Sequence, residues 1–450
     1  MSAPTLSSEP SSAATLGPRL AELLQWLWPA LDALPDAVLQ RAHRLWLDTA
    51  SCACAGLQAD EPRRWLELAS AGDGGDVPLP GTPSRLSASS AAMALALGAC
   101  WDEACEGLAL AHGRPGVPVV AALWAHLPAQ PARWRQLWQA TVAGYEVAAR
   151  LGAWLRIPPG LHVDGVWSAF GAAAAAVRLA GGNAAMALQS LEAAATQLPY
   201  SLLRPVRQGA NIRNLYLGHS AWLGLQAARA VRAGLLAPAG AIDDFAALAL
   251  PGAPAGTWLP PGRWLLLESY WKPFAAVRHV HYGAQAALGL RAAGLPLQAI
   301  DGIQLQVYPE ALHYCANRAP ATPIAAQFSL SFGVAAALRF GDLSPAEFRS
   351  PRFDDPELRR LEALVQTTGM SFPEGRRGAL LLVEAGGRQW QYRQDAVTGD
   401  AGHEPDDAAV LAKFARYTGN DTEMTAWARQ VQAHDPDAAA VLPTLLPERR

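Results

Sequence analysis

The sequence predicts a mainly α-helical protein that consists of a large all-α domain and a smaller α+β domain. Between residues 19 and 262, apolar residues recur at helical spacing in one segment after another. Between residues 265 and 398, several segments instead alternate apolar and polar residues, as half-buried strands do. The 450 residues leave room for both domains, because a single core stops growing at about 250–300 residues.

The first region is predicted to be a buried helical bundle. In its first helix Val38, Leu45 and Trp46 recur at helical spacing, with Arg41 and Arg44 between them. Alanine-rich stretches indicate that neighbouring helices approach closely, and glycine or proline clusters separate the helices. The predicted helices are residues 38–53, 89–100, 133–155, 166–179, 183–196 and 219–233.

The second region follows the Pro/Gly-rich stretch 251–262. Alternation predicts strands at 302–308, 379–384 and 388–393, and the last two flank an Ala-Gly-Gly hairpin turn. A helix is expected at 325–340. Residues 406–433 are again helical, so the segment 400–450 is expected to return to the first region.

Composition excludes several classes of protein. The net charge of −3 argues against a nucleic-acid binder, and the alanine-rich stretch 169–177 is too short to span a bilayer. The first 18 residues lack the basic start and apolar stretch of a secretory signal, so a cytoplasmic protein is expected. The five cysteines form no C-x-x-C pair, which predicts free thiols and no metal centre. The glycines at 72–75 follow no predicted strand, so no phosphate loop is expected.

Ionisable residues gather in three places beside glycine or proline. Each cluster combines groups that can exchange a proton with fixed cations. Such a set suits chemistry next to a carboxylate, where a general base moves a proton and cations hold the developing negative charge. The clusters are 100–103 with 112–118, 160–164 with 207–219, and 272–274 with 278–281.

Other interpretations of these residues compete. His279 and His281 could bind a metal from one face of a strand, but they lack an acidic or third histidine neighbour. Ser269 and Lys272 match the S-x-x-K nucleophile motif without the S-D-N or K-T-G that accompanies it. Lys272 and Lys413 are the only lysines, and a lysine can lose its proton where an arginine cannot. Lys413 lies on a C-terminal helix that is expected to be exposed.

The order and spacing of several motifs resemble those of the MmgE/PrpD family, over roughly residues 40–415. This family includes 2-methylcitrate dehydratase, cis-aconitate decarboxylase and iminodisuccinate epimerase. The stretch 144–151 (GYEVAARL) resembles the family's G-Y-E-V-A-A-R-L. The other similar stretches are GLH at 160–162, AFGAAA at 169–174, LYLGH at 215–219, KPF with RHVH at 272–281, AQFSL at 326–330 and GD at 399–400.

The resemblance implies a helical bundle with an α+β lid, an active site between them, a homodimer and no metal or organic cofactor. His162 and Lys272 match the family's active-site histidine and lysine. Other positions depart from its pattern. In the motif D-F-D-D-T, Cys100 replaces the first aspartate and Ala104 replaces the threonine. Arg114 replaces the histidine of H-P-G, and Arg213 replaces an active-site lysine. Tyr216 replaces the histidine of L-H-P-G-H. His112 could substitute for the histidine that became Arg114.

The resemblance implies a cofactor-independent lyase, of dehydratase or decarboxylase type, that acts on a small di- or tricarboxylate. Two alternatives stay open: an epimerase or isomerase of a dicarboxylate such as iminodisuccinate, and a carboxylate-binding protein that has lost its activity. The expected catalytic residues are Lys272, His162, His112 and Asp102, and the expected substrate-binding residues are Arg114, Arg213, Tyr216, Arg278 and Cys100.

Overall fold

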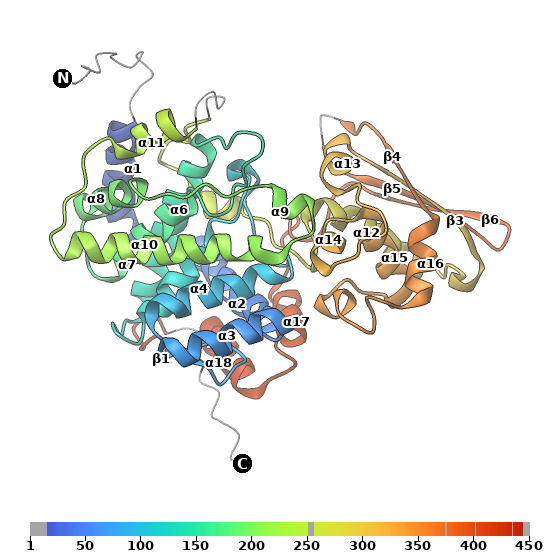
Figure 1. Cartoon of the computed structure of the whole chain (residues 1–450), viewed down its shortest axis with the longest axis horizontal. Coiled ribbons are helices and arrows are strands. Elements are labelled where there is room, and N and C mark those ends of the chain that lie inside the picture. The colour runs from blue at the N-terminus through green and yellow to red at the C-terminus, as the bar shows by residue number, and fades with distance from the viewer. Residues whose placement is uncertain (1–15, 251–255, 374–375, 401, 434, 444–450) are drawn as a thin grey trace, which may run out of the picture.

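The computed structural model describes residues 16–250, 256–373, 376–400, 402–433 and 435–443 (Figure 1). Nearly all of the N-terminal stretch considered for a secretory signal lies outside the described residues, as does the start of the Pro/Gly-rich stretch at 251–262. The described part contains eighteen α-helices and one four-stranded sheet. The predicted fold class, mainly α with a smaller α+β part, is confirmed.

A large group of helices, here called the helical body, forms most of the molecule. Its N-terminal helices are α1 (Leu16–Ala30), α2 (Asp36–Leu57), α3 (Asp60–Gly72), α4 (Ala88–Trp101), α5 (Gly116–His126), α6 (Trp134–Trp154), α7 (Ser168–Leu179), α8 (Ala184–Ala195), α9 (Arg204–Arg207), α10 (Tyr216–Arg232) and α11 (Ala241–Ala249). A short hairpin of β1 (Gly74–Pro78) and β2 (Arg85–Leu86) lies between α3 and α4.

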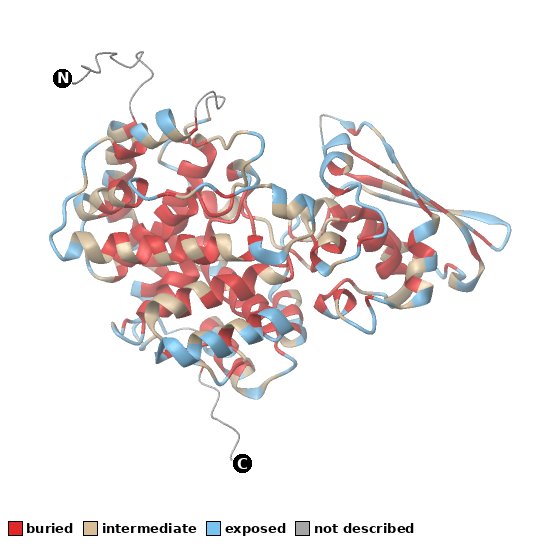
Figure 2. Cartoon of the chain, in the orientation of Figure 1, coloured by how far each residue is buried: buried red, intermediate tan, exposed pale blue. Residues whose placement is uncertain are grey.

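The core of the helical body is built around α7, which packs against α5, α6, α8 and α10. Its alanines are buried, and Figure 2 shows buried residues concentrated in the middle of the body. The helices touch backbone to backbone, since a Cβ on Gly144 of α6 would lie 2.5 Å from the carbonyl oxygen of Gly171 in α7. The close approach expected from the alanine-rich sequence is therefore present.

A smaller group of elements, here called the lid, covers residues 278–394. Its sheet has the order β4-β3-β5-β6, in which β3 pairs parallel with β4 and antiparallel with β5. Helices α12 and α15 pack against the sheet. The lid consists of α12 (Arg278–Ala292), β3 (Ile300–Val307), α13 (Pro309–Cys315), α14 (Pro323–Gln327), α15 (Leu330–Phe340), α16 (Pro356–Leu364), β4 (Val365–Gly369), β5 (Ala379–Ala385) and β6 (Arg388–Gln394).

The last two helices, α17 (Asp407–Tyr417) and α18 (Thr422–Ala433), both pack against α2 of the helical body. Figure 1 shows them beside the blue N-terminal helices, far from the strands of the lid. Arg44 of α2 and Asp407 of α17 form an ion pair 3.0 Å long on the surface of this contact.

Several details of the secondary structure differ from the sequence prediction, which did not give α1, α3 or α5 as separate helices and which ran α17 and α18 together. The helix expected at 325–340 is two helices, because the backbone turns at Phe328 and the Ser329 side chain caps α15 by accepting the N–H of Phe332. Strand β4 was not predicted, and neither was the hairpin of β1 and β2, which begins within the glycines at 72–75. No helix in the described residues is long and apolar enough to cross a bilayer.

Candidate active site

The loop that follows α4 brings the first charged groups into the contact between the helical body and residues 270–272. The backbones of Gly107 and Tyr270 exchange two hydrogen bonds, of 3.2 and 2.8 Å, which align the two segments. Glu103 has a φ of 53°, a left-handed backbone conformation that residues other than glycine seldom adopt. A backbone held in this region is found mainly where the surrounding contacts over-determine it, and often at functional sites.

The carboxylate of Glu103 is surrounded by three cations. Arg114 Nη1 lies 3.0 Å from Oε1, and Arg213 pairs with the same oxygen. Lys272 Nζ lies 3.0 Å from Oε2 and also donates to the backbone carbonyl of Glu103 at 2.7 Å. All four residues are buried, so these charges meet with little screening by water.

A second carboxylate, Asp164, faces the same two arginines. It pairs with Arg114, and its Oδ2 lies 3.5 Å from Arg213 Nη1. Burial alone would raise the pKa of Asp164, but the charge of Arg114 and its hydrogen bond to Asp164 outweigh burial and hold that pKa below its usual range. Asp164 is therefore ionised, and the cluster contains two carboxylates and three cations.

Lys272 is 2% exposed, and this burial is the main reason why its pKa is lowered. Tyr270 and Cys105 raise the pKa, while Arg114 and Arg213 lower it further. The amine therefore loses its proton more readily than a surface lysine does, as a group that exchanges protons near neutral pH requires.

His162 borders the cluster and is one of its more accessible members, with its side chain 12% exposed. Its Nδ1 accepts the backbone N–H of Asp164 at 3.0 Å, so the proton of the neutral ring is on Nε2. Burial lowers the pKa of His162, which keeps the ring neutral. A neutral imidazole in this tautomer can donate a hydrogen bond to a ligand oxygen from Nε2.

The lid closes over this cluster through the segment that contains α14. Gln327 Nε2 donates to the carbonyl of Trp101 at 3.1 Å, and the ring of Phe328 lies 5.6 Å from the guanidinium of Arg213. Gln327 Oε1 and Arg213 Nε are buried and have no hydrogen-bond partner among the described residues. Unpaired polar atoms at one buried boundary are the groups that a polar ligand would satisfy.

Gly399 fixes the backbone next to Lys272. The N–H of Trp271 donates to the Gly399 carbonyl at 2.9 Å, and Gly399 has a φ of 95°. A Cβ at this position would lie 2.1 Å from the carbonyl oxygen of Trp271. Only glycine fits here, which explains why a Gly-Asp turn stands at 399–400.

The structure brings some of the predicted site residues together and leaves others outside. Lys272, Arg114, Arg213 and His162 belong to one cluster. The Tyr216 ring lies 5.8 Å from His162, but its hydroxyl donates to the Leu202 carbonyl. Cys100 is buried beside Cys105.

Three predicted residues point elsewhere. Asp102 Oδ2 pairs at 2.9 Å with Arg349 of the lid. His112 is exposed, at the left-handed end of a short 3-10 helix. Arg278 pairs with Asp400 and stacks 4.4 Å from the Tyr270 ring. In the described residues no group of three or more His, Cys, Asp or Glu side chains is placed to hold a metal ion.

Sequence reasoning did not select Glu103 and Asp164 as site residues, although both stand in the ionisable clusters 100–103 and 160–164. A signal was available, because buried cations require carboxylates as partners. Glu103 directly follows Asp102, and Asp164 lies two residues after His162.

The expectation that Lys413 lies on an exposed helix face was wrong. Lys413 is 2% exposed and pairs with Asp48 of α2, because α17 turns this side of the helix toward the body. Its ammonium also donates to the carbonyls of Ala104 and Lys272, each at 2.8 Å. It therefore fixes the backbone on both sides of the cluster.

Comparison with protein-family models gives two matches along the chain. The model of the MmgE/PrpD N-terminal domain matches residues 28–249, and that of the MmgE/PrpD C-terminal domain matches residues 274–434. Lys272 lies in the short interval between them. A search of curated proteins gave no significant match.

Proposed function

Because the chain belongs to the MmgE/PrpD family, whose members are generally dehydratase-type lyases, we propose that it is a cofactor-independent lyase acting on a small di- or tricarboxylate. The observation that carries the proposal is the buried cluster of Lys272, Arg114 and Arg213 around the carboxylates of Glu103 and Asp164. A cluster of this kind binds an organic anion and supplies a lysine that can exchange protons.

Substrate binding is assigned to the arginines. Each guanidinium carries five N–H donors, so Arg114 and Arg213 can hold Glu103 and Asp164 and still donate to a substrate carboxylate. The unpaired Nε of Arg213 is available for such a contact, whereas the unpaired Oε1 of Gln327 can only accept a hydrogen bond from a donor group of the ligand. Their fixed positions stabilise negative charge that develops next to the bound carboxylate without reorganising during the reaction.

Proton transfer is assigned to Lys272. As a neutral amine it takes a proton from the carbon next to the substrate carboxylate, and Glu103 holds the resulting ammonium. His162 donates the hydrogen bond of its Nε2 to the oxygen on which charge develops. Asp102 is turned away and Ala104 has no hydroxyl, so the ammonium of Lys272 is also the group that protonates the leaving group.

Two further expectations about the molecule remain proposals. The all-α domain is assigned to residues 19–262, and the segment 400–450 is assigned to the same domain. The α+β domain is assigned to residues 265–398. The active protein is assigned as a homodimer that binds a small polycarboxylate. Limited proteolysis tests the domain boundaries, and measurement of the molar mass by light scattering tests the dimer. Both tests are independent of the reaction.

The reaction itself is tested in two steps. A thermal-shift screen of di- and tricarboxylates identifies ligands, and NMR in D₂O then follows deuterium incorporation and product formation. Elimination or loss of CO₂ together with exchange supports the lyase. Exchange with inversion and no elimination would favour the epimerase. Binding without exchange would favour a protein that has lost its activity, and no binding at all would sink the proposal.

A further inference from the structure

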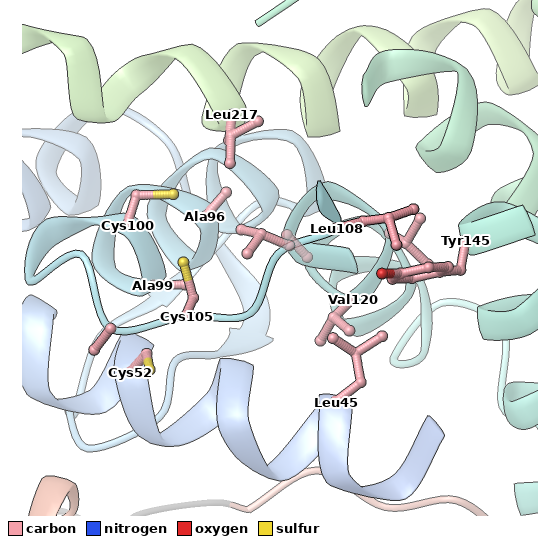
Figure 3. Packing of buried hydrophobic residues seen from close by; sticks show 14 of the residues in the cluster. Leu45, Cys52, Ala96, Ala99, Cys100, Cys105, Leu108, Val120, Tyr145 and Leu217 are labelled. Carbon is pink, nitrogen blue, oxygen red and sulfur yellow. The ribbon is translucent and has the colours of Figure 1, made fainter. Parts of the chain in front are cut away.

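Two cysteines face each other beside the candidate active site. Cys100 lies in the last turn of α4, and Cys105 lies at the end of the loop that contains Glu103. Figure 3 shows their sulfur atoms pointing toward each other, and both residues are buried. Because the thiols belong to the two ends of one short loop, a bond between them needs no movement of distant elements.

The two thiols differ in their surroundings. Arg114 Nη1 lies 3.5 Å from Cys105 Sγ, and the Cys100 thiol hydrogen-bonds to Cys105. This hydrogen bond, with the charges of Arg114 and Lys272, lowers the pKa of Cys105 despite its burial. Burial raises the pKa of Cys100. The pair therefore carries a thiolate on Cys105 and a thiol on Cys100.

The remaining cysteines have no such arrangement. Burial raises the pKa of Cys54 to about 12 and also raises that of Cys315. Cys52 lies near Cys105, but burial raises its pKa well above the usual range. The thiolate is the form that reacts with oxidants, so Cys105 should react first among the five.

We propose that Cys105 and Cys100 form a peroxide-reactive dithiol site, in which Cys105 is oxidised and Cys100 resolves the product as a disulfide. The Cys105 thiolate attacks one oxygen of hydrogen peroxide, forms a sulfenic acid and releases hydroxide. The Cys100 thiol then attacks the Cys105 sulfur, which forms the S–S bond and releases water. Peroxide takes up the two electrons that the thiols lose.

The disulfide changes the neighbouring cluster. A sulfur–sulfur bond is about 2.05 Å long, so the sulfur of Cys105 must move toward Cys100 and away from Arg114. Glu103 lies inside the loop that the bond closes, and Glu103 holds Lys272. Oxidation thus alters the site that binds the anion, and reduction by a thiol restores it. This inference does not depend on the proposed reaction.

The test begins with the reduced full-length protein, which needs no substitution. The protein is exposed to hydrogen peroxide for increasing times, remaining thiols are alkylated after unfolding, and peptides are analysed by mass spectrometry. Cleavage after Glu103 separates the two cysteines, so a disulfide keeps the fragments joined until a reductant is added. We expect a Cys100–Cys105 disulfide to form at least roughly tenfold faster than any oxidation of Cys54 or Cys315.

Three variants separate the roles of the cysteines. Cys100→Ser should stop at a sulfenic acid on Cys105 that dimedone traps, and Cys105→Ser should leave Cys100 as a thiol. Cys54→Ser is the matched control and should oxidise like the parent. Oxidation of all five cysteines at one rate, or a disulfide between Cys52 and Cys105, would overturn the proposal. The parent experiment decides the question even where a variant does not fold.

Discussion

The two lysines of the chain lie in neighbouring buried networks that are used differently. Lys413 donates to Asp48 and to two backbone carbonyls, which occupies all three N–H groups of an ammonium. Lys272 donates only to the carboxylate and the carbonyl of Glu103 among the described residues, which leaves one N–H for a ligand. We therefore propose that the saturated network supports the fold and that the unsaturated one serves the chemistry. Both lysines are 2% exposed, so the number of N–H groups already in use, and not burial, is what distinguishes them.

The strongest test of this comparison is Lys272→Arg. Arginine keeps the positive charge but cannot exchange its proton, so anion binding should remain while turnover falls by about 10²–10⁴-fold. Thermal shift with the ligand found by the screen measures binding, and deuterium incorporation measures proton transfer. Turnover equal to the parent would make Lys272 an anchor only and leave His162 to move the proton.

The counterpart is Lys413→Met, which leaves the buried carboxylate of Asp48 without its cation. Removing one partner of a buried pair costs about 3–5 kcal/mol, so the free energy of unfolding measured in urea should fall by that amount. Adding Asp48→Asn removes the unpaired charge and should recover part of the loss. A single variant as stable as the parent would show that Lys413 does not support the fold.

Glu106 lies between the two networks and should make stability depend on pH. Burial, followed by the Cys105 charge, raises the pKa of Glu106 to about 8. The folded state therefore holds a proton that the unfolded state releases at lower pH. The contribution is complete below the unfolded pKa of about 4.5 and is lost as pH rises through 8.

Glu106→Gln keeps an oxygen for the N–H of Gly116, which Glu106 Oε1 accepts at 2.7 Å, and removes the titration. The melting temperature of the variant should therefore fall less than that of the parent between pH 5 and pH 8, the range of about 4.5–8 in which Glu106 titrates. Parallel curves for the two proteins would contradict the assignment.

The smallest effect is expected from Ser269→Ala, which tests whether Ser269 acts with Lys272 as a nucleophile. Ser269 Oγ donates to the Leu266 carbonyl at 2.7 Å and accepts from Arg41, so its role is structural. Losing these bonds should cost about 1 kcal/mol and leave turnover unchanged. A loss of turnover at full stability would revive the S-x-x-K interpretation.

The fold was largely predictable because helical spacing and strand alternation are local properties of the sequence. The helix at 325–340 was predicted too long, since the turn at Phe328 serves a contact with the helical body. The candidate site was harder to predict from the sequence than the fold. Which of the adjacent acids Asp102 and Glu103 faces the cations depends on the left-handed backbone of Glu103, which composition does not reveal. The burial of Lys413 depends on Asp48, which is distant in sequence.

The pairing of Lys413 with Asp48 spans 365 residues and has a consequence for how the protein is made. Asp48 leaves the ribosome early, and at about 5–20 residues per second its partner follows roughly 20–70 seconds later. During that interval the carboxylate has no cation, and the carbonyls of Ala104 and Lys272 lack their shared donor. The loop that carries Glu103 can therefore take its final form only late in translation, so the nascent chain holds a helical body before it holds a working site.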